Sequence, residues 1–198
     1  MARTVVIATR NRKKFEEMAA LLGGLDLEVR PLADFPDVPT VPETGDTFEE
    51  NAKAKALAYA RATGQWALAD DSGLQVDALG GQPGVRSSRW GGEEGNDDLN
   101  NRTLLEAITD HPKETWTARY RCVVALATPD RVLLVAEGAC EGRITDRPAG
   151  SNGFGYDPHF YLPDVGRTMA QLAPSAKNRR SHRGRALRAL KPRLKKLL

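Results

Sequence analysis

Apolar residues in the first half of the chain form short continuous runs and helically spaced sets in turn, which predicts strands that feed helices. A β-branched apolar run at 4–9 precedes a helix with the apolar face Phe15, Met18, Ala19 and Leu22. Capping residues at 46–49 precede an alanine-rich helix that Gly64 ends. Residues 66–69 form a buried strand, and this strand runs directly into the polar sequence 70–73. We expect a functional site at that strand end.

The second half begins with a glycine-rich loop at 77–95 and continues with a second αβ pattern. Residues 96–98 cap a helix with the apolar face Leu104, Leu105 and Ile108. Alternating residues at 118–126 and an apolar run at 132–136 flank a Pro-Asp turn, which predicts a long β-hairpin. After a glycine-rich loop at 150–155, a last helix carries one apolar face made of Leu187, Leu190, Leu194 and Leu197.

Length and composition favour one globular domain over residues 1–198. The chain is 40% hydrophobic and 28% charged, enough for one well-buried core or one core with two lobes. No apolar run approaches the roughly 18 residues of a membrane helix, and residues 1–7 are too short and too quickly polar for a secretion signal. We therefore expect a cytoplasmic protein without a membrane partner. Cys122 and Cys140 lie in apolar stretches and are expected to be buried thiols.

The net charge of +3 conceals a strong asymmetry between the body of the chain and its end. Residues 177–198 contain ten of the 29 Lys and Arg residues and no acidic residue. The remaining chain has 19 basic residues against 26 acidic ones. Such a basic end is able to bind RNA, or to close over a polyphosphate held near carboxylates. Composition alone does not choose between these two uses.

The turn from residue 9 to residue 14 joins the first strand to the first helix. Free backbone N–H groups and the helix dipole favour an anion at such a helix start. Thr9 and Asn11 carry hydrogen-bonding side chains, Lys14 lies one turn into the helix, and Arg10 adds a positive charge. The alternative is an ordinary N-cap with solvated lysines. The glycine spacing and the Gly-Lys-Ser/Thr ending of a Walker loop are missing.

Two acidic segments provide candidate ligands for a metal ion. Glu43-Thr44-Gly45 and Asp70-Asp71-Ser72-Gly73 supply carboxylates, the groups that Mg²⁺ recruits beside substrate phosphates. The alternatives are a helix cap at Asp46 and an Asx-turn at Asp71. Packing gives no reason to place two repelling charges at the end of a buried strand. Asp70 and Asp71 are more plausible around a cation.

The third candidate region combines an aromatic loop with the start of the basic end. Phe154 and Tyr156 stand between glycines, so a base can stack on a ring while the backbone at Gly155 approaches the ligand. The alternative is a plain loop. The sequence Ser181-His182-Arg183-Gly184 opens the basic helix, and Lys177 precedes it. The alternative there is a solvated charged face.

In this order, the segments closely resemble the inosine triphosphate pyrophosphatase family over almost the whole chain. The resemblance rests on Thr9-x-Asn11-x-x-Lys14, on Glu43-Thr44-Gly45 with the helix up to Lys55, on residues 69–74 and 80–84, on residues 153–158, and on residues 181–184. Arg10 stands where glycine is common, and residues 174–176 stand where acidic residues are common. Neither departure changes a motif residue.

The resemblance implies an α/β fold with an elongated mixed β-sheet flanked by helices, two lobes with a central cleft, and a homodimer. It implies hydrolysis of inosine, deoxyinosine or xanthosine triphosphate to the monophosphate and pyrophosphate, with Mg²⁺ as cofactor. Glu43 and Asp71 would hold the metal, and Asp71 or Asp70 would activate water. The expected substrate-binding residues are Thr9, Arg10, Asn11, Lys14, Lys55, Ser72, Phe154, Gly155, Tyr156, Asp157, Lys177, His182 and Arg183.

Within this hypothesis, the two ends of the nucleotide are bound differently. Phe154 or Tyr156 would stack on the purine, and His182 and Arg183 would donate to its 6-oxo group. Adenine has a donor at that position, so a buried protein donor facing ATP would be left unpaired. Guanine keeps the 6-oxo acceptor, and the sequence gives no basis for the exclusion of GTP. Lys177 would close over the phosphates.

Three other functions compete with this one. A nucleic-acid-binding module would use the basic end and leave the acidic segments idle, so we expect no stable nucleic-acid partner. A nucleotide sensor would bind without turnover, which the presence of Lys14, Lys55, Asp70 and Asp71 argues against. A related pyrophosphatase would act on modified pyrimidines or on the common nucleotides.

Overall fold

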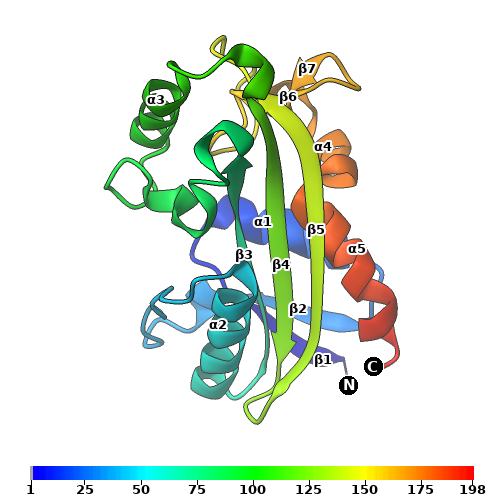
Figure 1. Ribbon diagram of the computed structural model, residues 1–198. Helices are drawn as coiled ribbons and strands as arrows, with labels where there is room; N and C mark the ends of the chain where they lie inside the picture. The colour runs from blue at the N-terminus through cyan, green and yellow to red at the C-terminus, as the bar shows by residue number, and fades with distance from the viewer. Residues whose placement is uncertain (1) are drawn as a thin grey trace. The chain divides into compact units, whose positions relative to one another are not determined.

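A computed structural model describes residues 2–198 and has a mixed α/β architecture (Figure 1). Seven strands form one sheet in the order β2-β1-β3-β4-β5-β6-β7. The strands are β1 (Arg3–Ile7), β2 (Leu27–Pro31), β3 (Trp66–Val76), β4 (Thr117–Ala127), β5 (Val132–Ile144), β6 (Phe160–Leu162) and β7 (Arg167–Thr168). The α-helices are α1 (Arg12–Leu22), α2 (Phe48–Thr63), α3 (Asp97–Ile108), α4 (Pro174–Arg180) and α5 (His182–Lys195). The predicted mixed sheet flanked by helices is confirmed.

The contacts divide the chain into two compact units. Unit 1 comprises Met1–Asp71, Cys122–Gly138 and Arg183–Leu198. Unit 2 comprises Ser72–Arg121 and Ala139–His182. Each unit has a hydrophobic core of its own.

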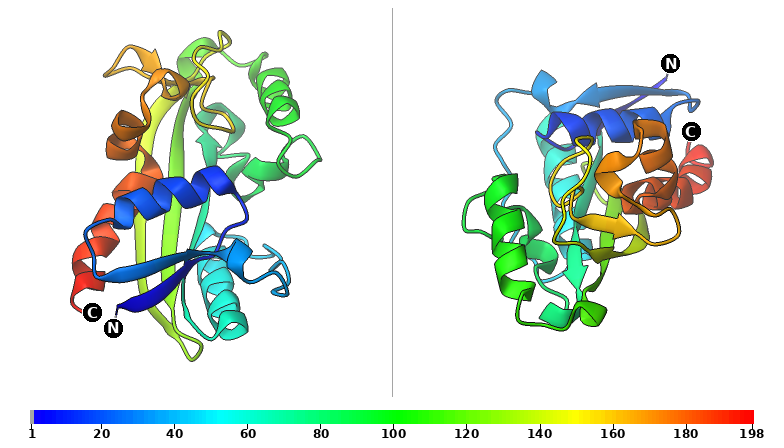
Figure 2. Two further views of the ribbon diagram at one scale, coloured as in Figure 1. Left: turned by 180° about the vertical axis from the view of Figure 1, so that it is seen from behind. Right: turned by 90° about the horizontal axis from the view of Figure 1, so that it is seen from above.

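In unit 1, β1 pairs in parallel with both β2 and β3. Parallel strands require crossover connections, and α1 and α2 supply them. The apolar faces of α1 and α5 share one core with β1, β3, β4 and β5, and the three predicted leucines Leu187, Leu190 and Leu194 are buried in it. The helix α2 lies on the face of the sheet opposite to α1 (Figures 1 and 2).

The helix ends in unit 1 follow the predicted signals. Thr47 caps α2 in a full capping box with Glu50, and Gly64 ends the helix at φ 67°. A side chain at that φ is strained, so glycine is favoured there. Asn11 caps α1 by accepting a hydrogen bond from the Lys14 N–H. These caps fix where each helix begins, and with it which side chains lie in the first turn.

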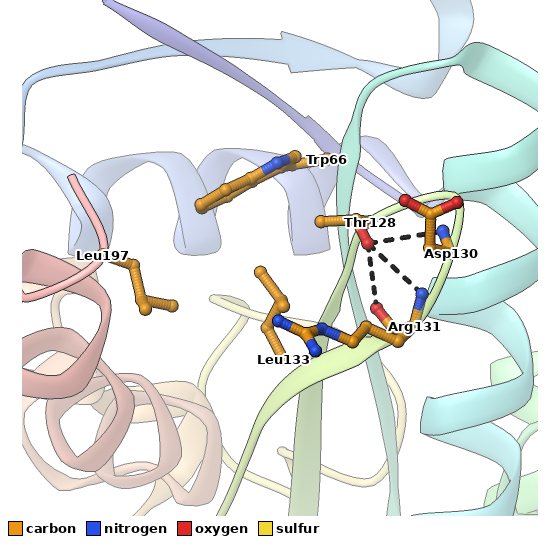
Figure 3. Close-up of a pocket in the computed structure, with 6 residues that line it drawn as sticks. All are labelled: Trp66, Thr128, Asp130, Arg131, Leu133 and Leu197. Atoms are coloured by element: carbon orange, nitrogen blue, oxygen red, sulfur yellow. Dashed lines mark hydrogen bonds between the residues drawn. The ribbon is translucent and has the colours of Figure 1, made fainter.

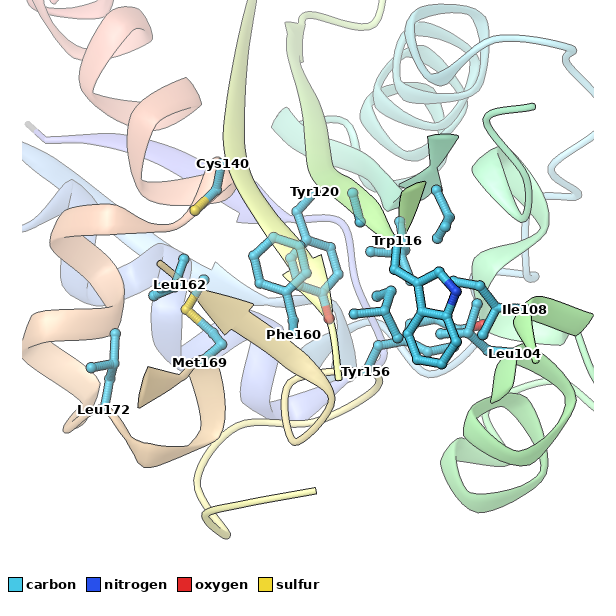
Figure 4. Close-up of a cluster of buried hydrophobic side chains, with 14 residues drawn as sticks. Leu104, Ile108, Trp116, Tyr120, Cys140, Tyr156, Phe160, Leu162, Met169 and Leu172 are labelled. Carbon is cyan, nitrogen blue, oxygen red and sulfur yellow. The ribbon is translucent and has the colours of Figure 1, made fainter. Parts of the chain in front are cut away.

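In unit 2, the helix α3 and residues of β3, β4, β5 and β6 form a second core (Figure 4). The pairs β5–β6 and β6–β7 are antiparallel. Gly142 is required in β5 because a Cβ atom there would lie 2.6 Å from the Phe160 ring. Asn96 caps α3 through the Leu99 N–H, as the sequence predicts.

Three expectations about the elements are wrong or incomplete. β3 does not end at residue 69 but continues through Asp70 and Asp71 to Val76, because cations neutralise both buried carboxylates. β5 runs to Ile144, beyond the predicted apolar run. Leu197 lies after the end of α5 and is 42% exposed, so it does not extend the apolar face. Within residues 2–198, no helix has the length and apolarity needed to cross a membrane.

Candidate active site

Asp70 lies near the middle of β3 and is surrounded by cations of unit 1. The Nε and Nη2 atoms of Arg183 donate to its Oδ2 at 3.3 and 3.2 Å. The Lys14 ammonium lies 3.5 Å from the same oxygen. Arg183 is 1% exposed, and its Nη1 donates to Glu17 Oε2 at 2.6 Å. The guanidinium of Arg183 therefore holds two acids, one on β3 and one on α1.

Asp71 has different partners, which come from α2 and from the segment before it. Asn51 Nδ2 donates to its Oδ2 at 3.0 Å, and Lys55 Nζ donates to its Oδ1 at 3.4 Å. The same Lys55 ammonium also donates to Glu43 Oε1. Asn51 and Lys55 are four residues apart and thus share one face of α2. Lys55 bridges the two carboxylates that the sequence assigns to the metal.

The two adjacent aspartates differ in protonation behaviour. Burial is the largest influence on both, and it favours the neutral acid. At Asp70, the cations Lys14 and Arg183 outweigh burial and hold its pKa well below the usual range. At Asp71, burial and the nearby Glu43 charge raise the pKa, although the Lys55 ammonium lowers it in part. Asp70 is therefore a fixed anion, whereas Asp71 is the better proton acceptor of the pair.

The acidic residues fit a divalent cation that is shared with a substrate. Among residues 2–198, no group of three or more acidic, histidine or cysteine side chains is arranged for a metal ion. Mg²⁺ at nucleotide sites needs only one or two protein carboxylates, because phosphate oxygens and water complete the shell. Glu43 and Asp71 are both bridged by the single ammonium of Lys55, so two carboxylates share one positive charge. This pair of carboxylates is therefore suited to a further cation.

The turn at residues 9–14 is a capped helix start. Thr9 Oγ1 accepts from the Asn11 N–H at 3.2 Å, and Asn11 Oδ1 accepts from the Lys14 N–H at 3.1 Å. Arg10 is directed elsewhere, with Nη2 donating to the Val38 carbonyl at 2.6 Å. The turn thus brings the Lys14 side chain to Asp70, and the phosphate role of Thr9, Arg10 and Asn11 stays a prediction.

The aromatic loop of unit 2 is organised around the buried carboxylate of Asp157. Its Oδ2 accepts from the Phe154 N–H at 3.0 Å and from Lys177 Nζ at 2.7 Å. A hydrogen bond from Tyr120 also reaches Asp157. Lys177 Nζ lies 4.7 Å from the centroid of the Phe154 ring, a cation–π distance. A Cβ at Gly153 would lie 2.0 Å from Asp157, so only glycine allows this arrangement.

The remaining predicted residues of unit 2 are placed by the core. Tyr156 is buried, and its hydroxyl donates to the Ser87 carbonyl at 2.7 Å. The His182 ring stacks on Tyr120 with centroids 4.7 Å apart. Ser72 is half-buried in β3. Phe154 is the less buried of the two loop aromatics and is therefore the better candidate for stacking on a base.

Sequence reasoning did not assign a role to three residues of these networks: Glu17, Asn51 and Tyr120. Two of them had a usable signal. Glu17 follows Lys14 by three residues, and Asn51 precedes Lys55 by four, so each shares a helix face with a predicted residue. Tyr120 had no such signal, because it reads as one more apolar residue of an alternating strand.

A separate pocket of about 460 Å³ lies on unit 1 (Figure 3). It is lined by Trp66, Thr128, Asp130, Arg131, Leu133 and Leu197. None of these side chains is a predicted site residue. The carboxylates and cations described above, and not this pocket, carry the candidate chemistry.

These features define a mixed α/β protein with a buried pair of aspartates, set among cations, in the middle of a sheet strand. Sequence comparison places it in a family: the model of the Ham1 family matches residues 5–193, and the chain belongs to that family. The chain is 52% identical over 186 residues to a dITP/XTP pyrophosphatase of Geobacillus kaustophilus (strain HTA426), covering 94% of this chain and 91% of the relative.

Two further relatives agree with this assignment. A dITP/XTP pyrophosphatase of Geobacter sulfurreducens is 51% identical over 190 residues, covering 96% of each chain. The solved structure of a HAM1 protein from Coxiella burnetii has a TM-score of 0.89 at 43% identity and covers 98% of this chain and 99% of that chain. The family predicted from the motifs is confirmed.

Proposed function

We propose that the chain hydrolyses dITP, ITP and XTP to the monophosphate and pyrophosphate, and so removes these nucleotides from the cellular pool. The observation that carries the proposal is the pair Asp70 and Asp71, which are adjacent on β3, pair with different cations and have pKa values shifted in opposite directions. Relatives named dITP/XTP pyrophosphatase that cover nearly the whole chain support the substrate class.

The phosphates are assigned to unit 1. Lys14 and Lys55 each carry an ammonium next to an aspartate, and both are able to shift to phosphate oxygens when these bring additional negative charge. The helix start at Asn11 adds backbone N–H groups. Thr9 and Arg10 are the remaining predicted contacts. Neutralisation of charge on the phosphates provides most of the rate enhancement.

Asp71 is the proposed proton acceptor. Water attacks the α-phosphorus, its proton passes to the Asp71 carboxylate, and the bond from the α-phosphorus to the bridging oxygen breaks so that pyrophosphate leaves with the electron pair. Asn51 fixes one oxygen of Asp71 through its hydrogen bond and leaves the other facing Lys55. Asp70 stays ionised and attracts Lys14 into the site.

Glu43 and Asp71 are the proposed Mg²⁺ ligands. Bound Mg²⁺ would withdraw charge from the phosphates and stabilise the leaving pyrophosphate.

The base is assigned to unit 2. Phe154 is the proposed stacking residue, with Gly155, Tyr156, Asp157 and His182 around it. The ammonium of Lys177 lies over the Phe154 ring and on Asp157, so we assign Lys177 to this loop as well as to its predicted phosphate role. We further propose that the protein is a homodimer. We also propose that it is cytoplasmic, because polymerases would otherwise use such nucleotides there.

A panel of nucleoside triphosphates tests the proposed function. With Mg²⁺, dITP, ITP and XTP are expected to give pyrophosphate and monophosphate, while ATP, which has an amino group in place of the 6-oxo acceptor, reacts at least about a hundredfold more slowly in kcat/KM. EDTA is expected to abolish turnover, because the phosphates then keep their full charge. Ion chromatography distinguishes pyrophosphate from orthophosphate. Orthophosphate as the first product, or turnover that persists in EDTA, would contradict the proposal.

Replacement of Lys55 tests the metal ligands independently of activity. Lys55 bridges Glu43 and Asp71, so its ammonium and Mg²⁺ compete for the same carboxylates. Lys55→Met is expected to bind Mn²⁺ or Mg²⁺ roughly tenfold more tightly without nucleotide, as removal of about 1.4 kcal/mol of repulsion would give, and to lose turnover. Metal binding is measured by calorimetry.

Lys53→Met is the matched control for this experiment. It removes the same charge from the same helix, but from a lysine that pairs with Glu49 and is 43% exposed. Its metal affinity is expected to be that of the wild type. Equal metal affinity in the Lys55 variant would argue against these two carboxylates as ligands.

A further inference from the structure

The loop that carries Phe154 is held from outside by one helix of unit 2. Both backbone groups of Gly155, the residue after Phe154, bond to α3. The Gly155 N–H donates to Asp97 Oδ2 at 2.7 Å, and Asn101 Nδ2 donates to the Gly155 carbonyl at 2.9 Å. These contacts join residues 58 and 54 positions apart, so local chain geometry does not produce them.

The two side chains act as one unit on the surface of α3. Asp97 and Asn101 are four residues apart and share a helix face. Asn101 Nδ2 also donates to the Asp97 carbonyl at 2.8 Å, which fixes the amide against its own helix. Asp97 is not needed as the helix cap, because Asn96 already accepts from the Leu99 N–H.

The helix behind these side chains is firmly anchored. Leu104 and Ile108 of α3 are fully buried in the core of unit 2, close to Trp116 (Figure 4). Asn100 is 2% exposed, accepts from the Gly91 N–H and donates to the Ser88 carbonyl. Leu104 and Ile108 follow Asp97 and Asn101 by seven residues and so lie on the same face of α3. A face that is anchored in the core at one end is able to hold the loop at its other end.

The Phe154 ring lies between two fixed points of the loop. On one side, Asp157 accepts from the Phe154 N–H itself. On the other, Gly155 has a φ of 63° and is bound by Asp97 and Asn101. With the backbone restrained at the Phe154 N–H and at Gly155, residue 154 loses little further backbone freedom when a base stacks on its ring.

We propose that Asp97 and Asn101 are positioning residues for base recognition: they hold Gly155 so that the Phe154 ring is preorganised for the purine. The inference rests on the proposed function, because it assigns the loop to the base of the nucleotide. Neither side chain needs to touch the substrate. Their loss is expected to weaken binding of the base and to leave binding of the phosphates unchanged.

Two variants of neighbouring acids provide a matched test. Asp97 and Asp98 are both exposed and both lie in the first turn of α3, so each contributes alike to the helix dipole. Only Asp97 bonds to the loop in the contacts described above. Asp97→Ala is expected to weaken binding of inosine monophosphate roughly tenfold, the upper range for one hydrogen bond, whereas Asp98→Ala leaves it within about twofold. Asp97→Asn keeps an oxygen acceptor and is expected to restore most of the affinity.

Inorganic triphosphate serves as the second probe in the same calorimetric titrations, because it has no base. Its affinity is expected to be equal in wild type, Asp97→Ala, Asn101→Ala and Asp98→Ala. In steady-state assays with ITP, Asp97→Ala is expected to raise KM and to keep kcat within about twofold. By hydrogen exchange, the Gly155 amide is expected to exchange faster in Asp97→Ala and not in Asp98→Ala.

The outcomes separate this inference from the proposed function. If the wild type binds inosine monophosphate and cleaves ITP, yet Asp97→Ala behaves like Asp98→Ala, the positioning role is wrong and the function stands. Equal losses for both probes in Asp97→Ala indicate general damage and also overturn the role. If the wild type neither binds inosine monophosphate nor cleaves ITP, the proposed function fails and the inference falls with it.

Discussion

Asp71→Asn is expected to lose at least about a hundredfold in kcat on dITP and XTP while binding of the nucleotide is largely kept. The amide accepts no proton, and it has one oxygen in place of two. The substitution is nearly isosteric, so the hydrogen bond from Asn51 and the packing of β3 have little reason to change. Single-turnover kinetics together with calorimetry on the monophosphate separate the chemical step from binding.

The matched control is Asp130→Asn, which makes the same change at an exposed acid in the turn between β4 and β5. It is expected to leave kcat unchanged. Asp70→Asn provides the contrast within the site. Its carboxylate is already held as an anion by Arg183 and Lys14, so its loss disturbs the placement of cations and does not remove a proton acceptor. A rate near normal in the Asp71 variant would contradict the assignment.

The helices were predictable because their signals are local. The capping box at Thr47, the left-handed Gly64 and the cap at Asn96 each act within a few residues, and each lies where the sequence places it. The apolar spacing then identifies the buried face of each helix. The end of α5 was not predictable in this way, since periodicity alone extends the helix face to Leu197.

The strands were less predictable because their limits depend on distant partners. A polar run such as Asp70-Asp71-Ser72-Gly73 predicts a loop. It continues a buried strand because cations from elsewhere in the chain neutralise its carboxylates, among them Arg183, 113 residues from Asp70. In β5, Cys140, Gly142 and Ile144 are buried in alternation, but glycine weakens the strand pattern. The need for Gly142 comes from the Phe160 ring, which no local pattern reveals.

In the candidate site, the residues themselves were predictable from the sequence, whereas their partners were not. The acids Glu43, Asp70 and Asp71 and the cations Lys14 and Lys55 were identified from their chemistry, and unit 1 brings all five into pairs. Which acid meets which cation did not follow from the sequence. That pairing lowers the pKa of Asp70 and leaves the pKa of Asp71 raised, so Asp71 is the aspartate that accepts a proton more readily.

Arg183 is the predicted site residue for which the geometry points to a different role. The sequence assigns it to the 6-oxo group of the purine, whereas its guanidinium donates to Asp70 and Glu17 in unit 1. All three side chains are largely or fully buried. We propose that Arg183 is a positioning residue that keeps Asp70 ionised and ties α1 to β3. The two roles predict different kinetics.

Arg183→Met is expected to destabilise the fold by about 3–5 kcal/mol, because it leaves two buried carboxylates without their cation. Thermal denaturation measures this loss, and Arg185→Met, an exposed site on the same helix, is expected to keep the wild-type melting temperature. Adding Asp70→Asn removes one of the two buried negative charges that Arg183→Met leaves without a cation. The double variant is therefore expected to lose less free energy of unfolding than the sum of the losses in the two single variants.

Kinetics of a milder variant decide between the two roles. Arg183→Lys keeps a positive charge but loses the forked donor geometry, so it is expected to fold. If Arg183 positions Asp70, kcat/KM falls by a similar factor for ITP and for ATP, and the preference between them stays constant. If Arg183 donates to the 6-oxo group, kcat/KM falls for ITP alone and the preference for ITP over ATP decreases, because adenine does not accept a hydrogen bond from that donor. A smaller preference for ITP over ATP, together with an unchanged melting temperature, would support the contact of Arg183 with the purine and contradict the positioning role.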